Sequence, residues 1–133
     1  MKLIVDTNRI IAALIKNSLC RHVITHTTTE LFTVHLAIQE IDKYVPLIID
    51  KSSLSESEIR IILDKILAKM IILDDSIINP HMPEAKKIMD KIDPADTPFI
   101  AAALAVKSDI WSDDTHFDKQ SKIKIWKTKD LIT

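Results

Sequence analysis

Lys2-Leu3-Ile4-Val5-Asp6, near the start of the chain, is the stretch that decides the fold. Its apolar, β-branched run predicts a short buried strand that stops at Asp6. Three further short runs of the same kind follow, and then a fifth that is flanked by lysines, as expected for an edge strand. These runs cover Leu31 to Val34, Met70 to Leu73, Ile110 to Ser112 and Ile123 to Trp126.

Between these strands, apolar residues recur with helical spacing. Pro46 is expected to kink or end one helix, and Ser55 with Glu58 forms the capping-box pattern that opens the next. Short strands that alternate with helices predict a three-layer α/β/α sandwich around a mostly parallel sheet of about five strands. The expected helices cover residues 8–15, 20–27, 37–48, 55–67, 83–92 and 99–107.

The composition fits a single domain over residues 1–133, because 47% of the residues are apolar and can form one core. The chain contains no glycine, which excludes glycine-rich phosphate-binding loops. No apolar run approaches the roughly 20 residues that span a bilayer, so we expect a cytoplasmic protein without membrane contact. The net charge of -1 gives no general affinity for nucleic acid, which would depend on a local basic surface or on metal.

Acidic residues gather near the ends of the predicted strands. Asp6 follows the first strand, and Asp113 and Asp114 follow the fourth. Asp96 starts the helix that leads into the fourth strand, and Glu40 lies one to two turns into the helix after the second. Alone, each has an ordinary explanation as a turn residue, a helix cap or an exposed side chain. Together they could meet at one edge of the sheet, where carboxylate oxygens suit Mg²⁺ or Mn²⁺.

Four stretches carry a family resemblance. They are Ile4-Val5-Asp6-Thr7-Asn8, then Glu40 in a helix, then Asp93-Pro94-Ala95-Asp96-Thr97-Pro98-Phe99-Ile100-Ala101-Ala102-Ala103-Leu104, then Trp111-Ser112-Asp113-Asp114-Thr115-His116-Phe117. In order and spacing they resemble the PIN-domain family over essentially the whole chain. The resemblance implies a five-stranded parallel sheet with helices on both faces. It also implies divalent-metal-dependent cleavage of RNA, in many members as the toxin of a VapC-type toxin–antitoxin pair.

The resemblance also implies roles for individual residues. Glu30 stays open as an alternative to Glu40, and Asp113 as an alternative to Asp114, although the hydroxyl-x-Asp spacing from Ser112 favours Asp114. The family often places a serine or threonine at Ser112, where it supports the first aspartate. The implied catalytic acids, which are also the ligands of one or two Mg²⁺ or Mn²⁺ ions, are Asp6, Glu40, Asp96 and Asp114, and the implied supporting residues are Asn8, Ser112, Asp113, Asp118 and Asp93.

Basic residues near the acids are candidates for contacts with RNA. Lys119 and Lys122 begin a lysine-rich C-terminal stretch, and with Arg9 they are candidates for binding the RNA backbone. The alternative is a solvated lysine-rich edge that discourages strand pairing. Arg9 departs from the family, which commonly has an apolar residue there. The resemblance further implies an antitoxin protein as a partner and a homodimer.

Two other functions compete with the nuclease. Ile71-Ile72-Leu73-Asp74-Asp75 is similar to the phosphoacceptor strand of a receiver-like signalling domain, in which Asp6 would be the first-strand acid. A catalytically silent PIN-like binding module would keep the fold without the reaction. His22 and His26 share a helix face but lack a clear third ligand, so we expect a surface or partly packed pair. His116 follows the fourth stretch and is a candidate for contacting substrate, although the resemblance assigns it no role.

Overall fold

A parallel sheet forms the centre of the computed structural model, which describes residues 1–16 and 18–132. The described residues form five strands in the order β3-β2-β1-β4-β5, and all neighbouring pairs are parallel. The α/β fold class, the existence of each strand and the edge position of the last one are confirmed. The strands are β1 (Lys2–Val5), β2 (Glu30–Val34), β3 (Met70–Leu73), β4 (Asp109–Trp111) and β5 (Ile125–Trp126).

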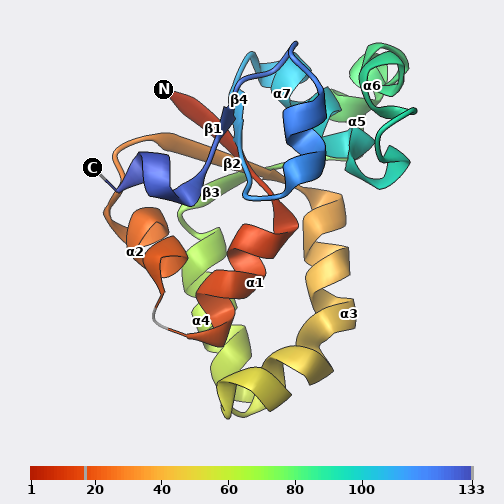
Figure 1. Ribbon diagram of the computed structural model, residues 1–133. Helices are drawn as coiled ribbons and strands as arrows, with labels where there is room; N and C mark the ends of the chain where they lie inside the picture. Colours follow the sequence, from red (N-terminus) through yellow and green to blue (C-terminus); the bar gives the residue numbers. More distant parts are fainter. Residues whose placement is uncertain (17, 133) are drawn as a thin grey trace.

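Helices cover both faces of the sheet (Figure 1). On one face lie α1 (Thr7–Ile15), α2 (Leu19–His26), α3 (His35–Ser52) and α4 (Glu56–Leu67). On the other face lie α5 (Asp75–Ile78), α6 (Met82–Met89) and α7 (Thr97–Val106). Among the described residues, no helix is both long enough and apolar enough to cross a membrane. Short 3-10 helices complete the connections: η1 (Asn79–His81), η2 (Pro94–Asp96), η3 (Thr115–Lys119) and η4 (Thr128–Leu131).

The alternation of β1 divides the core into two layers. Leu3 and Val5 pack with the helices α1 to α4, whereas Ile4 packs with α7 on the opposite face. Successive side chains of a strand point to opposite faces, so a strand that is apolar at every position must be covered on both sides. The central position of β1 in the sheet meets this requirement, and it holds Asp6 in a fixed place at the end of the strand.

Pro46 does not end its helix, which was one of the two outcomes expected for it. The helix α3 runs through Pro46 to Ser52, and it bends along its length (Figure 1). Proline cannot donate to the carbonyl of Asp42, but both residues lie on the exposed side of the helix, where water can replace the lost bond. Burial of Val45 and Ile48 on the other side holds the helix together.

Turns without glycine place other residues in the left-handed region. Lys107, the C-cap of α7, has φ 54° and ψ 55°, and Ser53, the C-cap of α3, has φ 62° and ψ 18°. Glycine is the usual residue at such a helix end, because a Cβ atom makes this conformation costly. Lys107 and Ser108 lead into the start of β4, so this turn connects α7 to the strand whose other end is followed by Ser112, Asp113 and Asp114.

Candidate functional site

The strand order creates an opening between β1 and β4. From β1 the chain continues to β2 and β3 on one side of the sheet and then returns to β4 and β5 on the other. In open α/β sheets, ligands bind beyond the carboxyl ends of the strands at the point where the strand order reverses. Asp6 follows β1, and Ser112, Asp113 and Asp114 follow β4. The topology therefore brings these residues to the position where a site is expected.

Asp6 is buried at this position, with 5% of its surface exposed. Its backbone N–H donates to the Trp111 carbonyl oxygen at 3.1 Å, and its Oδ2 accepts a hydrogen bond from Ser112 Oγ at 2.8 Å. Asp6 is the N-cap of α1, yet its side chain makes no capping hydrogen bond within the described residues. Burial raises the pKa of Asp6 despite the Ser112 hydrogen bond, and the charge of Asp114 adds to the rise. Helix capping thus leaves this carboxylate unexplained.

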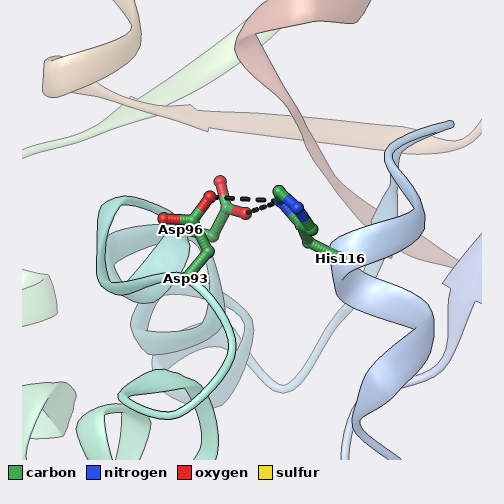
Figure 2. A group of neighbouring side chains, drawn as sticks. All are labelled: Asp93, Asp96 and His116. Carbon is green, nitrogen blue, oxygen red and sulfur yellow. Dashed lines mark ion pairs between the residues drawn. The ribbon is translucent and has the colours of Figure 1, made fainter.

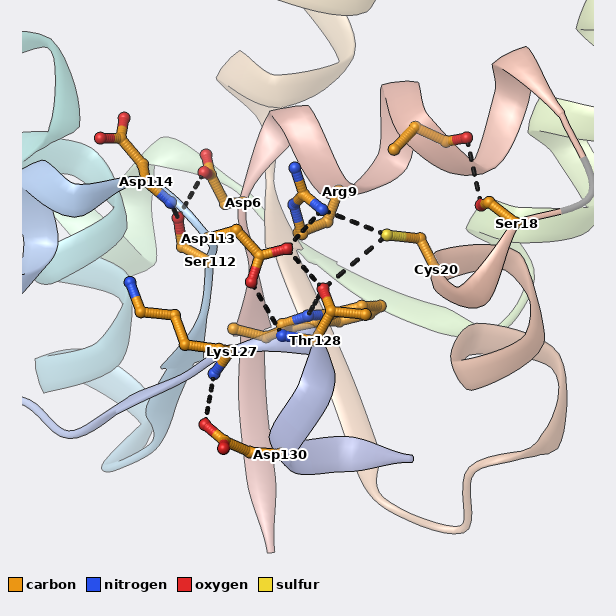
Figure 3. A network of polar contacts seen from close by, with 12 residues as sticks. Asp6, Arg9, Ser18, Cys20, Ser112, Asp113, Asp114, Lys127, Thr128 and Asp130 are labelled. Carbon is orange, nitrogen blue, oxygen red and sulfur yellow. Dashed lines mark hydrogen bonds and ion pairs between the residues drawn. The ribbon is translucent and has the colours of Figure 1, made fainter. Parts of the chain in front are cut away.

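Ser112 links Asp6 to Asp114 (Figure 3). Its Oγ donates to Asp6 Oδ2 and accepts the backbone N–H of Asp114 at 3.0 Å. Asp114 Oδ1 in turn accepts the backbone N–H of His116 at 2.9 Å, which fixes the carboxylate at the start of η3. A single buried hydroxyl therefore sets the relative positions of two acids that are 108 positions apart in the sequence.

Asp113 faces away from this pair, toward Arg9 and Thr128 (Figure 3). Its Oδ2 lies 2.6 Å from Arg9 Nη1 and accepts a hydrogen bond from Thr128 Oγ1 at 2.6 Å. Its Oδ1 accepts a hydrogen bond from the backbone N–H of Thr128 at 2.8 Å. Burial alone would raise the pKa of Asp113, but the two Thr128 hydrogen bonds and the charge of Arg9 lower it. Of the two adjacent acids left open by the sequence, the geometry places only Asp114 toward Asp6.

Asp96 comes from the turn that precedes α7. Among the described residues its Oδ2 is buried without a hydrogen-bond partner, and its side chain does not cap the helix. Burial raises its pKa to about 7, and the charges of Asp93, Asp6 and Asp114 contribute to this rise. Asp96 therefore lies close to Asp6 and Asp114 and belongs to the same group of acids.

Glu40 lies beside this group on α3 and is half-buried. Burial raises the pKa of Glu40, and the charge of Asp6 raises it further. Its alternative, Glu30, is exposed at the start of β2, where it lies opposite Lys2 in the register of β1 and β2. The starts of parallel strands lie at the edge of the sheet opposite to their carboxyl ends, so Glu30 is on the wrong side for this group.

His116 joins the acids from η3, as Figure 2 shows. Its Nδ1 lies 3.1 Å from Asp93 Oδ2, 3.5 Å from Asp114 Oδ1 and 3.9 Å from Asp96 Oδ2. One atom each of Asp93, Asp96 and His116 lies within 4.8 Å of the other two, a spacing that a metal ion could bridge. From the sequence, His116 was only a candidate for contacting substrate. Its only signal was its place two residues after Asp114, because the direction of the η3 turn was not predicted.

Other candidates lie outside this group. Asn8 is exposed, and Asp118 pairs with Lys127 at 2.8 Å. Lys119 and Lys122 line a separate cleft with Lys87 of α6. The predicted pair His22 and His26 stacks at 4.2 Å between ring centroids on an exposed face, as expected.

The receiver-like interpretation is wrong. Asp74 follows β3, an edge strand that β2 separates from β1. The Asp74 carboxylate accepts the Ser76 N–H at 2.9 Å and caps α5. Asp74 and Asp6 therefore follow strands that are not neighbours.

The chain is similar to known proteins in sequence pattern and in fold. Residues 4–133 match the family model for the PIN domain, whereas no curated protein matches the sequence. VapBC2 from Rickettsia felis, solved with a DNA fragment from its promoter, has a chain with TM-score 0.71 and 14% identity, covering 96% of this chain and 98% of that chain. PAE2754 from Pyrobaculum aerophilum has TM-score 0.70 and 18% identity, covering 98% and 86%. VapBC-1 from nontypeable Haemophilus influenzae has TM-score 0.68 and 14% identity, covering 97% and 99%.

Proposed function

The chain belongs to the PIN domain family, and on this premise we propose that it is a divalent-metal-dependent endoribonuclease that hydrolyses RNA phosphodiester bonds. The observation that carries the proposal is the convergence of Asp6, Asp96 and Asp114 at the carboxyl ends of β1 and β4, with Glu40 alongside. These residues come from four separate parts of the chain. Helix capping explains neither Asp6 nor Asp96, since within residues 1–16 and 18–132 neither side chain makes a capping hydrogen bond.

The donor atoms fit a hard divalent cation. Carboxylate oxygens suit Mg²⁺ and Mn²⁺, which keep several waters when they bind to proteins. Burial is the main cause of the raised pKa values of Asp6, Glu40 and Asp96, and neighbouring carboxylates raise each of them further, which favours the binding of a cation. In the described part of the chain, Asp96 Oδ2 is buried and has no hydrogen-bond partner that would explain its position. We propose that Asp6, Glu40, Asp96 and Asp114 hold one or two such ions.

The chain's own residues prepare the site for a phosphodiester. A bound divalent cation supplies positive charge that offsets the repulsion between the acids and a phosphate, and it acts as a Lewis acid in hydrolysis. Ser112 keeps Asp6 in one orientation and holds the backbone of Asp114. Asp113 and Arg9 neutralise each other on the far side of this segment. Burial and the neighbouring acids raise the pKa of Asp96 to about 7, so part of the Asp96 population would carry a proton near neutral pH and would have to lose it to act as a metal ligand.

Cleavage of a labelled single-stranded RNA in the presence of Mn²⁺ tests this function. We expect wild-type protein to cleave it, EDTA to abolish cleavage, and Asp114→Asn to reduce the rate by at least about 100-fold, as for the loss of a group that stabilises transition-state charge. Asp64→Asn is the matched control, because Asp64 is an exposed acid on α4. Unchanged cleavage by Asp114→Asn would contradict the assignment. A wild-type protein that folds and binds RNA without cutting it would support the catalytically silent module instead.

The cleft between α6 and the end of η3 with the residues that follow it supports a role in binding the RNA backbone for Lys119 and Lys122. Lys87 faces the same cleft, and in the described residues none of the three lysines makes an ion pair. Arg9 is less suited, since it is already paired with Asp113. Each lysine that contacts a phosphate should contribute about 0.7 to the slope of log affinity against log salt. A slope unchanged in Lys119→Gln/Lys122→Gln would exclude them.

A toxin role is the finer proposal, supported by the similarity to two VapBC proteins. Under this proposal an antitoxin protein binds the chain and blocks cleavage, and the toxin forms a homodimer. Induced expression of wild-type protein should arrest growth, whereas Asp114→Asn should not. Arrest by both proteins would indicate toxicity unrelated to the acidic site.

A further inference from the structure

A groove of about 550 Å³ lies directly beside the acidic residues. One wall is α3, and the other is formed by α6 and the segment that leads into α7. Glu40 belongs to both the groove and the proposed metal site, and Thr97, which follows Asp96, also lines the groove. We propose that the groove binds the base of an unpaired nucleotide next to the cleaved bond, with the base stacked on Tyr44. This inference rests on the proposed ribonuclease function and extends it to the substrate.

The helix α3 places an aromatic ring next to Glu40. Leu36, Glu40, Lys43 and Tyr44 all line the groove, and their spacing of four, seven and eight positions from Leu36 puts them on one face of the helix. Tyr44 lies four residues beyond Glu40, about 6 Å along the helix axis. A base on this ring would therefore belong to a nucleotide near the phosphate held at the acids.

Tyr44 is the aromatic side chain that the fold leaves free for stacking. The chain has three phenylalanines, two tryptophans and one tyrosine. Among these six residues, all of which the structure describes, only Tyr44 is exposed, at 45% of its surface. Trp126, which is half-buried, already carries Lys124 over its ring at 4.2 Å. Unpaired bases stack on such rings, whereas a base in a duplex is already stacked and paired.

The charges of the groove fit a nucleotide once a cation is bound. Lys43 and Lys86 lie on opposite walls, and in the described part of the chain neither makes an ion pair. Asp90 and Glu40 balance them, so the groove has no net charge by itself. A divalent cation that neutralised Glu40 would leave the two lysines opposed by Asp90 alone, an excess of one positive charge near the phosphates. Apolar side chains contact the space between the walls and can cover the faces of a base: Leu36, Met82, Pro94 and Pro98.

Paired changes in protein and RNA test this inference. Wild-type, Tyr44→Ala, Tyr44→Phe and Leu47→Ala proteins are compared on a labelled single-stranded RNA that contains one cleavage position. Leu47 is the matched control, because it is exposed on the same helix at 44% but does not line the groove. Each protein is also given RNAs in which one nucleotide beside the cleavage position is abasic. The readouts are KM and kcat, together with the Kd from fluorescence anisotropy in the Asp114→Asn background.

Stacking predicts a specific pattern of losses. Tyr44→Ala should raise KM and Kd about 10-fold with little change in kcat, while Tyr44→Phe, which keeps the ring, and Leu47→Ala should resemble wild type. One abasic position should reproduce the loss in wild-type protein and cause no further loss in Tyr44→Ala. Equal KM values for Tyr44→Ala and wild type, as for a groove that binds a peptide, would overturn the inference while the ribonuclease stands. A wild-type protein that neither binds nor cleaves RNA would overturn both.

Discussion

At the residue scale, one hydroxyl organises the acidic group. Ser112 Oγ donates to Asp6 and accepts from the backbone of Asp114, so it fixes both residues at once. Adjacent side chains after β4 then divide into two environments. Asp114 faces other acids, whereas Asp113 faces a guanidinium and a threonine. This division gives opposite expectations for stability at two neighbouring positions.

Asp113 should matter more for stability than Asp114. In Asp113→Ala the partly buried Arg9 and the Thr128 N–H lose their partner, which should lower the free energy of unfolding by about 2 kcal/mol. In Asp114→Ala the lost hydrogen bond to His116 is offset by reduced repulsion, so the change should stay below about 1 kcal/mol without metal. Urea denaturation in EDTA measures both values. The reverse order would show that Asp113, not Asp114, belongs to the acidic group.

Asp96 should make stability depend on pH in the absence of metal. Its pKa is about 7 in the folded protein, whereas the ordinary pKa of an aspartate, taken for the unfolded chain, is 3.8. Between these pH values Asp96 binds more protons in the folded protein than in the unfolded chain. The contribution of protonated Asp96 to stability is therefore complete below about pH 3.8 and is lost as the pH rises through 7. At pH 8 in EDTA, Asp96→Asn should therefore raise Tm by about 4 °C for a gain on the order of 1 kcal/mol.

Thermal unfolding between pH 5 and pH 8 checks this expectation at roughly one-unit intervals. The advantage of Asp96→Asn over wild type should shrink as the pH falls. Mn²⁺ should raise the Tm of wild type at pH 8 and should have less effect on the variant. An advantage that is constant over this range would mean that Asp96 is ionised throughout and that its burial has another cause.

At the element scale, the turn between α7 and β4 carries a cost. Lys107 has positive φ, and this conformation costs a residue with a Cβ atom about 1–2 kcal/mol more than glycine. Lys107→Gly should therefore raise the free energy of unfolding by about 1 kcal/mol, although glycine lowers it elsewhere. Lys65→Gly, inside α4, is the matched control and should lower it by a similar amount. Destabilisation by both variants would indicate that the Lys107 side chain makes a contact that matters more than its backbone.

Elements with a strong local signal could be predicted from the sequence. β1 contains the continuous apolar run Leu3-Ile4-Val5, and the Ser55–Glu58 capping box opens α4 as expected. The short helix α5 was missed, because four residues leave no helical period to detect. The continuation of α3 past Pro46 was also uncertain, since burial of residues on both sides of the proline overrides its local preference.

The candidate site could be predicted only where its residues have a local signal in the sequence. Strand ends point to Asp6 and Asp114, but the orientation of Asp113 depends on Arg9 and Thr128, which are remote in sequence. The approach of His116 to Asp93 depends on the direction of η3. The exposure of Tyr44 beside Glu40 depends on how α6 and the segment before α7 pack next to α3. None of these features has a local signal in the sequence.

At the scale of the whole molecule, the fold separates structural and chemical tasks. Apolar layers on both faces of the sheet fix the strands, and the carboxyl ends of β1 and β4 remain as the place where charged groups gather. The net charge of -1 hides this separation, because acids gather at one edge while lysines that have no ion pair within the described residues line neighbouring clefts. The central claim is that this edge becomes a functional site only when a divalent cation balances the acids.

Anomalous diffraction from crystals soaked in Mn²⁺ tests this claim most directly. We expect a Mn²⁺ peak bonded to carboxylate oxygens of Asp6, Asp96 and Asp114, at about 2.2 Å as for a hard divalent ion with oxygen ligands. We also expect that the peak disappears in Asp114→Asn crystals soaked in the same way. Absence of a peak between these residues in the wild-type protein, or a peak only at other positions, would contradict the account.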